Sequence, residues 1–133
     1  MISKISKRGS THDSNQDFMV IHESEDHIKG VLADGCSTGK HSELISRIAC
    51  MTFKRGFEQP DMLSDQNVSS KFIMIKAHLD WLELSQEYGF TTVILFVYHK
   101  TTKTLRVRFF GDGCMCINGE FMEIDQENIP DYF

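Results

Sequence analysis

Three short stretches of the sequence combine an acidic residue with a position where a strand is expected to begin or end. They are Asn15-Gln16-Asp17, Asp34-Gly35 and Gly111-Asp112-Gly113. A hard divalent cation such as Mg²⁺ or Mn²⁺ prefers carboxylate and carbonyl oxygens, and strand ends can direct such oxygens at a common point. Each stretch alone is also typical of an ordinary turn, because Asp and Gly favour turns. Their recurrence at three places favours a carboxylate metal site centred on Asp34.

A second motif overlaps the Asp34 stretch and indicates a different chemistry. Residues 35–42, Gly-Cys-Ser-Thr-Gly-Lys-His-Ser, follow an expected strand and open an expected helix, which is the setting of a phosphate-binding P-loop. The spacing disagrees with that motif, because only three residues separate Gly35 from Gly39 and His41 stands where Ser or Thr is required after Lys40. Nucleotide binding is therefore a minor alternative, and it predicts an ATP affinity that Lys40→Ala abolishes.

The histidines give weaker signals than the aspartates. None of the six has a metal-ligand spacing along the chain, and His22, His27 and His99 are expected at surface positions on strands or turns. His12 and His41 lie near the acidic stretches, where either could contact a phosphate. A solvated side chain is the favoured interpretation of both.

The cysteines are expected to be reduced, since the sequence has no extracellular features. Cys114 and Cys116 would point to the same face of a strand, which raises the hypothesis of a zinc or redox site. Their C-x-C spacing is not the usual C-x-x-C, and small thiols are common in cores. We therefore favour a structural role for Cys114 and Cys116.

The first half of the chain predicts a hairpin followed by two helices. Alternating apolar residues predict strands over Phe18–His22 and Ile28–Ala33, joined by a polar turn. Apolar residues at helical spacing then occur over 44–52, with an expected end near Gly56. A second helical stripe covers 72–82, with Gly89 as the expected C-cap.

The second half predicts strands only. Thr91–Tyr98 is rich in β-branched and aromatic residues, as buried strands are, and Thr104–Phe110 follows after a four-residue turn. Asn118-Gly119 is the strongest hairpin signal in the sequence. The predicted order is ββααββββ, which favours an α+β layered architecture over a doubly wound parallel sheet.

The composition narrows the class of protein. A chain of 133 residues that is 41% apolar and 25% charged predicts one soluble globular domain. A net charge of -5 argues against nucleic acid as a main partner. The longest apolar run, Thr92–Tyr98, is too short to cross a membrane, and the N-terminus lacks the apolar stretch of a signal peptide. We therefore expect a cytoplasmic protein.

Together these motifs resemble the metal-dependent protein phosphatases of the PPM, or protein phosphatase 2C, family. Ser14-Asn15-Gln16-Asp17-Phe18 is similar to the family's Asn-(Glu/Gln)-Asp motif, and residues 31–37 are similar to its strand followed by Asp-Gly. Gly89-Phe90-Thr91-Thr92-Val93 resembles its Gly-Thr-Thr strand entry, and residues 110–113 resemble its Gly-Asp motif before the Asn-Gly hairpin. The motifs occur in the family's order along nearly the whole chain. Residues 1–133 are thus expected to be the N-terminal part of one α-β-β-α sandwich domain, which they leave incomplete.

The resemblance implies a binuclear Mg²⁺ or Mn²⁺ centre. Asp34 would bridge two ions, the Gly35 carbonyl would bind one of them, and Asp17 would hold metal-bound waters. Asp112 would border a third, weaker cation position. The implied reaction is attack of a metal-activated water on phosphoserine or phosphothreonine in a protein substrate, with Asp34 and Asp17 as the catalytic residues.

The sequence departs from the family pattern at three points. The basic residue that grips the phosphate in many members aligns near His12, so phosphate binding by His12 would be weaker or pH-dependent. Cys36 stands where some relatives carry a His proposed as general acid, which leaves that role unassigned. The family's remaining metal-binding aspartates lie beyond the final hairpin, whereas this chain ends at Phe133. We favour a piece of a longer enzyme over a naturally short, inactive relative.

A non-catalytic role is the main alternative to an enzyme. A truncated phosphatase-like module could bind a partner through its helices or through an open sheet edge. Strand edges left unpaired by the missing half would also favour self-association.

Overall fold

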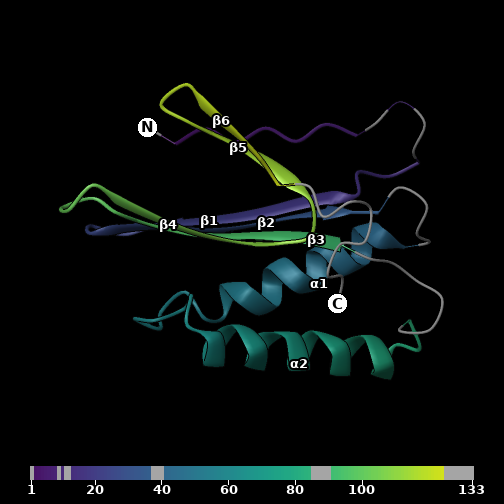
Figure 1. Cartoon of the computed structure of the whole chain (residues 1–133). Helices are drawn as coiled ribbons and strands as arrows, with labels where there is room; N and C mark the ends of the chain where they lie inside the picture. The colour runs from purple at the N-terminus through teal and green to yellow at the C-terminus, as the bar shows by residue number, and fades with distance from the viewer. Residues whose placement is uncertain (1, 9, 11–12, 37–40, 85–90, 125–133) are drawn as a thin grey trace.

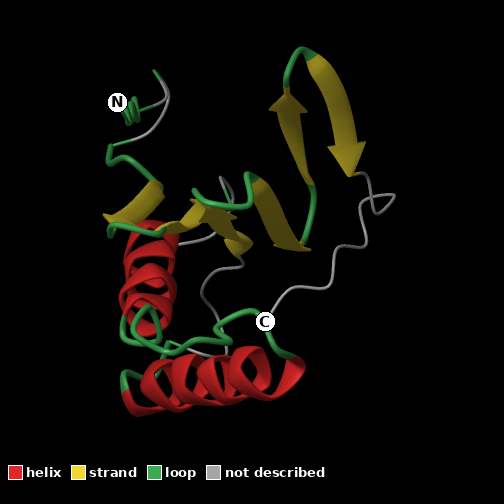
Figure 2. Ribbon diagram, turned by 90° about the vertical axis from the view of Figure 1, so that its left-hand side faces the viewer, coloured by secondary structure: helices red, strands yellow, loops and turns green. Residues whose placement is uncertain are grey.

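The computed structural model describes residues 2–8, 10, 13–36, 41–84 and 91–124, which form an α+β fold with the predicted order ββααββββ (Figure 1). The helices lie on one side of a four-stranded sheet and a separate hairpin lies on the other (Figure 2). The elements are β1 (Asp17–Glu23), β2 (His27–Gly35), α1 (Ser42–Lys54), α2 (Asp65–Trp81), β3 (Thr91–His99), β4 (Thr104–Phe110), β5 (Gly113–Ile117) and β6 (Glu120–Ile124).

The main sheet is antiparallel throughout, in the order β1-β2-β3-β4. β2 and β3 pair directly although both helices separate them in the chain. Along β3 the buried side chains alternate, since side chains on a strand point to opposite faces in turn. Thr91, Val93, Leu95 and Val97 are buried on one of these faces. The strand predicted over Thr91–Tyr98 is confirmed, and its alternation gives the sheet one core face.

Helix α1 covers that core face, and α2 packs against α1. Ile45, Ala49 and Phe53 of α1 are at most 2% exposed. Phe72 of α2 contacts Phe53 and Phe110 in T-shaped ring pairs with centroids 5.1 and 4.8 Å apart. The two helices and the sheet therefore share one core.

The second helix ends with its apolar stripe and well before the predicted C-cap at Gly89. α2 stops at Trp81, and Glu83 adopts a left-handed φ of 56°. Leu84 N then donates to Leu79 O at 2.8 Å, and Glu83 N donates to Asp80 O at 3.1 Å. This pattern is a Schellman motif, which terminates the helix. The prediction of a C-cap at Gly89 is thus wrong for α2, and Gly89 itself lies outside the described residues.

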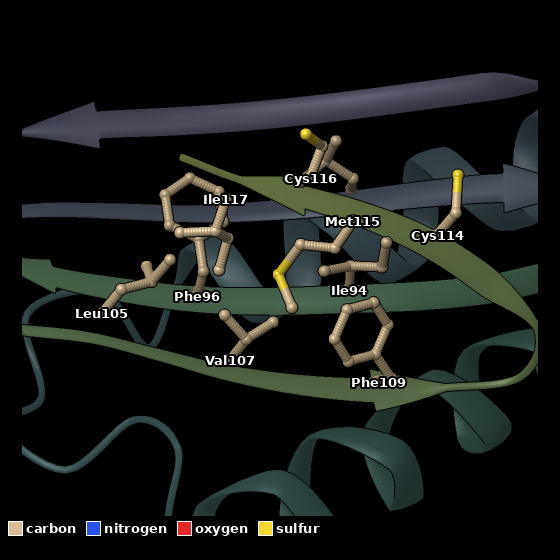
Figure 3. Close-up of a pocket in the computed structure, with 10 residues that line it drawn as sticks. Ile94, Phe96, Leu105, Val107, Phe109, Cys114, Met115, Cys116 and Ile117 are labelled. Carbon is tan, nitrogen blue, oxygen red and sulfur yellow. The ribbon is translucent and has the colours of Figure 1, made fainter. Parts of the chain in front are cut away.

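Strands β5 and β6 form a hairpin over the face of the sheet opposite the helices (Figures 1 and 2). Asn118 and Gly119 have φ of 53° and 88°, the left-handed values that a two-residue hairpin turn requires. The hairpin predicted at this dipeptide is confirmed. Below it lies a cavity of about 290 Å³ lined only by apolar and sulphur-containing side chains (Figure 3). Among them are Ile94, Val107, Phe109 and Met115.

No helix within the described ranges is long and apolar enough to cross a membrane. All four cysteines are free thiols, and Cys114 and Cys116 are exposed rather than part of the core.

Candidate metal centre

Asp17 and Asp34 face each other across the first two strands. Asp17 begins β1 and Asp34 is the penultimate residue of β2, and the two are direct register partners. Side chains of opposed residues in an antiparallel pair have Cβ atoms roughly 4.5–5.5 Å apart on the same face. The hairpin register therefore brings together two of the three aspartates that the sequence singles out.

The pairing changes the acidity of Asp34. Partial burial of its carboxyl, the hydrogen bond with Asp17 and the negative charge of Asp17 together raise the pKa of Asp34 from 3.8 to about 6. The residue still has an exposed surface at the strand end, so solvent moderates the effect. Two carboxylates that repel each other attract a cation, because a divalent ion replaces the repulsion by attraction to both.

Gly35 is fixed by close packing rather than by an unusual backbone angle. A side-chain Cβ at this position would lie 2.8 Å from Ser42 Cβ and 2.9 Å from the carbonyl oxygens of Gln16 and Ser42. Gly35 N donates to Gln16 O at 3.3 Å. The end of β2 can therefore approach α1 and the entry to β1 only because residue 35 is glycine.

Gln16 connects the β1–β2 hairpin to the first helix. Its side-chain Nε2 donates to Ser42 Oγ at 2.8 Å and to Cys36 O at 3.4 Å. Ser42 is fully buried. Asp17 N donates to Asn15 Oδ1 at 3.2 Å, an Asx-type turn that sets the start of β1. These bonds hold the backbone that leads into Asp17.

Two buried hydroxyl groups form a hydrogen-bond chain to the backbone carbonyl of Asp34. Thr91 Oγ1 donates to Asp34 O at 3.0 Å, and Ser46 Oγ lies 3.0 Å from Thr91 Oγ1. Ser46 is 0% and Thr91 4% exposed, so water does not compete for these bonds. Sequence reasoning missed Gln16 as a support as well as Ser42, Ser46 and Thr91. Their only signal is a polar residue at a position that should be buried.

Asp112 lies at the same end of the sheet but not in the Asp17–Asp34 pair. Gly111 has φ of 90°, and a Cβ there would lie 2.7 Å from Thr92 Cγ2. Thr92 is the register partner of Asp34 on β3. No group of three or more His, Cys, Asp or Glu side chains in the described part of the chain is close enough to hold a metal ion. Asp112 is therefore a separate, half-buried position.

The remaining predicted site residues are placed only in part. His12 lies outside the described residues, as do Lys40 and the middle of the P-loop-like segment. His41 is described as the N-cap position of α1, with a left-handed φ of 59°. Its Nδ1 is 3.7 Å from Glu43 Oε1.

The pair fits one hard cation in ligand type and charge, because both groups offer carboxylate oxygens. Two carboxylates carry half the charge of two divalent ions. A binuclear centre would need further acidic ligands.

Comparison with known proteins gives matches among solved structures only. No family model matches the sequence, and no curated protein matches it. A bacterial serine phosphatase superposes with a TM-score of 0.68 at 16% identity, over 96% of this chain and 62% of that one. The Mycobacterium tuberculosis serine/threonine phosphatase PstP superposes with a TM-score of 0.62 at 22% identity, over 93% of this chain and 53% of that one.

This chain has the fold of the PPM-type serine/threonine phosphatases. A structure of the PstP catalytic domain in complex with two manganese ions has the same fold, with a TM-score of 0.61 and 21% identity. The manganese ions are a property of that protein, and the likeness to this chain is one of fold. This chain spans 53 to 62% of the length of the three phosphatases.

Proposed function

We propose that residues 1–133 are the N-terminal part of a single PPM-type phosphatase domain that hydrolyses phosphoserine and phosphothreonine in proteins. The observation that supports this proposal is the direct pairing of Asp17 with Asp34 at the strand ends of a phosphatase fold. A structural hairpin has no need of two opposed carboxylates, since like charges directly opposite each other destabilise a sheet. This loss of sheet stability is explained if the pair binds cations.

Each acidic residue has a distinct part in the proposal. Asp34 and the Gly35 carbonyl would bind Mg²⁺ or Mn²⁺ directly. Asp17 would accept hydrogen bonds from waters bound to the ions and orient them. Asp112 would border a further, weaker cation position, and His12 would contact the phosphate. When bound, the ions would lower the pKa of the attacking water and stabilise charge on the phosphate.

Metal affinity is expected to be limited in this chain alone. Asp17 and Asp34 supply two negative charges, which neutralise one divalent ion and not two. We therefore expect one ion to bind detectably and a second to need acidic residues from outside residues 1–133. The proposal extends to the cytoplasmic location and phosphoprotein substrate expected from the sequence.

The test is hydrolysis of p-nitrophenyl phosphate in the presence of Mn²⁺, with the full-length protein. Asp34→Asn should abolish Mn²⁺-dependent turnover. Asp61→Asn is the matched control, because it removes the same charge from an exposed residue remote from the pair and should leave turnover unchanged. Equal activity in the Asp34→Asn variant and the wild type would refute the assignment of Asp34.

A second candidate function is a non-catalytic interaction module. The observation that favours it is the loosely covered face under the β5–β6 hairpin, with its apolar cavity (Figure 3). Phe121 and Met122 of the hairpin are 67% and 54% exposed, so the hairpin offers apolar surface to a partner. A chain that folds stably yet binds no Mn²⁺ in calorimetry would favour this module over the enzyme.

A further inference from the structure

Two histidines meet at the end of the sheet that is remote from Asp34. His27 begins β2 and His99 ends β3, and the two are direct register partners. Their ring centroids are 4.3 Å apart with an interplanar angle of 66°. Both residues are half-buried, which corrects the expectation of two separate surface histidines. The two show no metal-ligand spacing along the chain because 71 residues lie between them.

The spacing of the rings is close to that of two imidazoles bound to one ion. Zinc–nitrogen bonds are about 2.0–2.1 Å long, and a ring centroid lies roughly 1.1 Å beyond its nitrogen. Two such ligands at an angle of about 90–110° have centroids roughly 4.5–5.2 Å apart. The observed 4.3 Å needs only a small opening of the pair. Rotation about the side-chain torsions can supply that opening, because neither ring is fully buried.

The charges around the pair also suit a cation. Glu25 and Asp26 lie in the adjoining turn, both exposed. The two neighbouring lysines are held by other partners. Lys100 Nζ is 2.6 Å from Glu23 Oε1, and Lys29 Nζ donates to the carbonyl oxygens of Phe57 and Gln59. Neither ammonium group therefore needs to occupy the space beside the imidazoles.

We propose that His27 and His99 bind one divalent transition-metal ion of the imidazole-preferring class, Zn²⁺, Ni²⁺ or Cu²⁺. Each histidine provides one ring nitrogen, and water completes the coordination, since no third ligand group adjoins the pair within the described ranges. Affinity should follow the usual order for nitrogen ligands, with Cu²⁺ above Ni²⁺ and Zn²⁺, and Mn²⁺ weakest.

This site is separate from the Asp17–Asp34 pair. His27 and Asp34 are seven residues apart on β2, which corresponds to about 23 Å along a strand at 3.3 Å per residue. The two sites also differ in chemistry. Carboxylates prefer hard Mg²⁺ and Mn²⁺, whereas imidazoles prefer the borderline ions. One polypeptide can therefore bind two kinds of ion at opposite ends of one strand.

The test is titration of the untagged, metal-free chain with Zn²⁺ and with Cu²⁺, followed by calorimetry and by electron paramagnetic resonance. We expect binding with nitrogen hyperfine structure from two imidazoles. His27→Ala and His99→Ala should each weaken metal binding by at least about tenfold, because one of the two imidazole ligands is lost. His22→Ala is the matched control, since His22 lies nearby on β1 with its ring centroid 6.3 Å from that of Phe57.

Several outcomes would overturn the proposal. One is an affinity that is unchanged in both His27→Ala and His99→Ala. Another is a copper spectrum with a single nitrogen ligand. A third is loss of Zn²⁺ binding in Asp34→Asn with retention in His99→Ala, which would move the ion to the carboxylate pair. Far-UV circular dichroism of each variant separates loss of the ligand from loss of the fold, and His99→Gln provides a second, milder variant if His99→Ala unfolds.

Discussion

Replacement of Asp34 by asparagine should make the metal-free protein more stable at neutral pH. In the native fold, burial, the hydrogen bond with Asp17 and the charge of Asp17 raise the pKa of Asp34 from 3.8 to about 6. A shift of about two units corresponds to roughly 3 kcal/mol at about 1.4 kcal/mol per unit. Asp34 is exposed on one side, so solvent screening reduces the expected gain to about 1 kcal/mol.

The pH dependence has a definite sign. A carboxyl with a higher pKa in the folded protein than in the unfolded chain binds its proton more tightly when folded. The contribution of Asp34 to stability is therefore fully present below pH 3.8 and is lost as the pH rises to about 6. The advantage of the Asp34→Asn variant over wild type should be absent at low pH, grow over this interval and stay constant above it.

Thermal unfolding in EDTA between pH 4 and pH 8 measures this difference. A gain of about 1 kcal/mol should raise the Tm by about 3–5 °C for a domain of this size. Asp61→Asn should leave the Tm unchanged. Saturating Mn²⁺ should reverse the order, because ligand at about 100 times its Kd stabilises the wild type by about 2.7 kcal/mol and the variant lacks the site. A variant less stable than wild type in EDTA at pH 7.5 would refute the reasoning about charge repulsion.

Three further substitutions test the supports and the hairpin. Thr91→Val removes the hydroxyl that contacts Ser46 and the Asp34 carbonyl. Urea unfolding should show a loss of stability of about 1–2 kcal/mol, and calorimetry should show weaker Mn²⁺ binding. Unchanged Mn²⁺ affinity would mean that these hydrogen bonds do not position Asp34. Gly35→Ala should cost about 1–3 kcal/mol in the same assay through overlap at 2.8–2.9 Å, whereas Gly113→Ala, with its nearest contact at 3.7 Å, should cost less. Phe121→Lys should abolish any self-association seen in sedimentation, while Ile73→Lys, which replaces a 70% exposed side chain on α2, should not.

The elements of the fold could be predicted because their signals are local. The alternation along β3 and the Asn118-Gly119 turn each depend on adjacent residues, and both match the structure. The end of α2 could not be predicted in the same way. Glu83 adopts the left-handed position that usually goes to glycine, and the bonds of Leu84 and Glu83 to the preceding turn stabilise it.

The acidic residues of the candidate site could be predicted from the sequence, but the residues that hydrogen-bond to the backbone around them could not. Asp17 and Asp34 flank a short hairpin, so their opposition follows from a register that local sequence nearly determines. Ser46 and Thr91 are 45 residues apart, and nothing in either neighbourhood indicates that their hydroxyls meet. The pairing of His27 with His99 depends in the same way on β2 and β3 being neighbours, which only the packed sheet reveals.

Separate hydrogen bonds connect helix α1 to the backbone near Asp17 and near Asp34. Ser42 accepts from Gln16, the residue before Asp17, and Ser46 reaches the Asp34 carbonyl through Thr91. The first two turns of the helix are thus bonded, through the side chains of Gln16 and Thr91, to the backbone beside each of the two acids. A substitution in the first two turns of α1 therefore disturbs the backbone at both acids although it changes neither carboxylate.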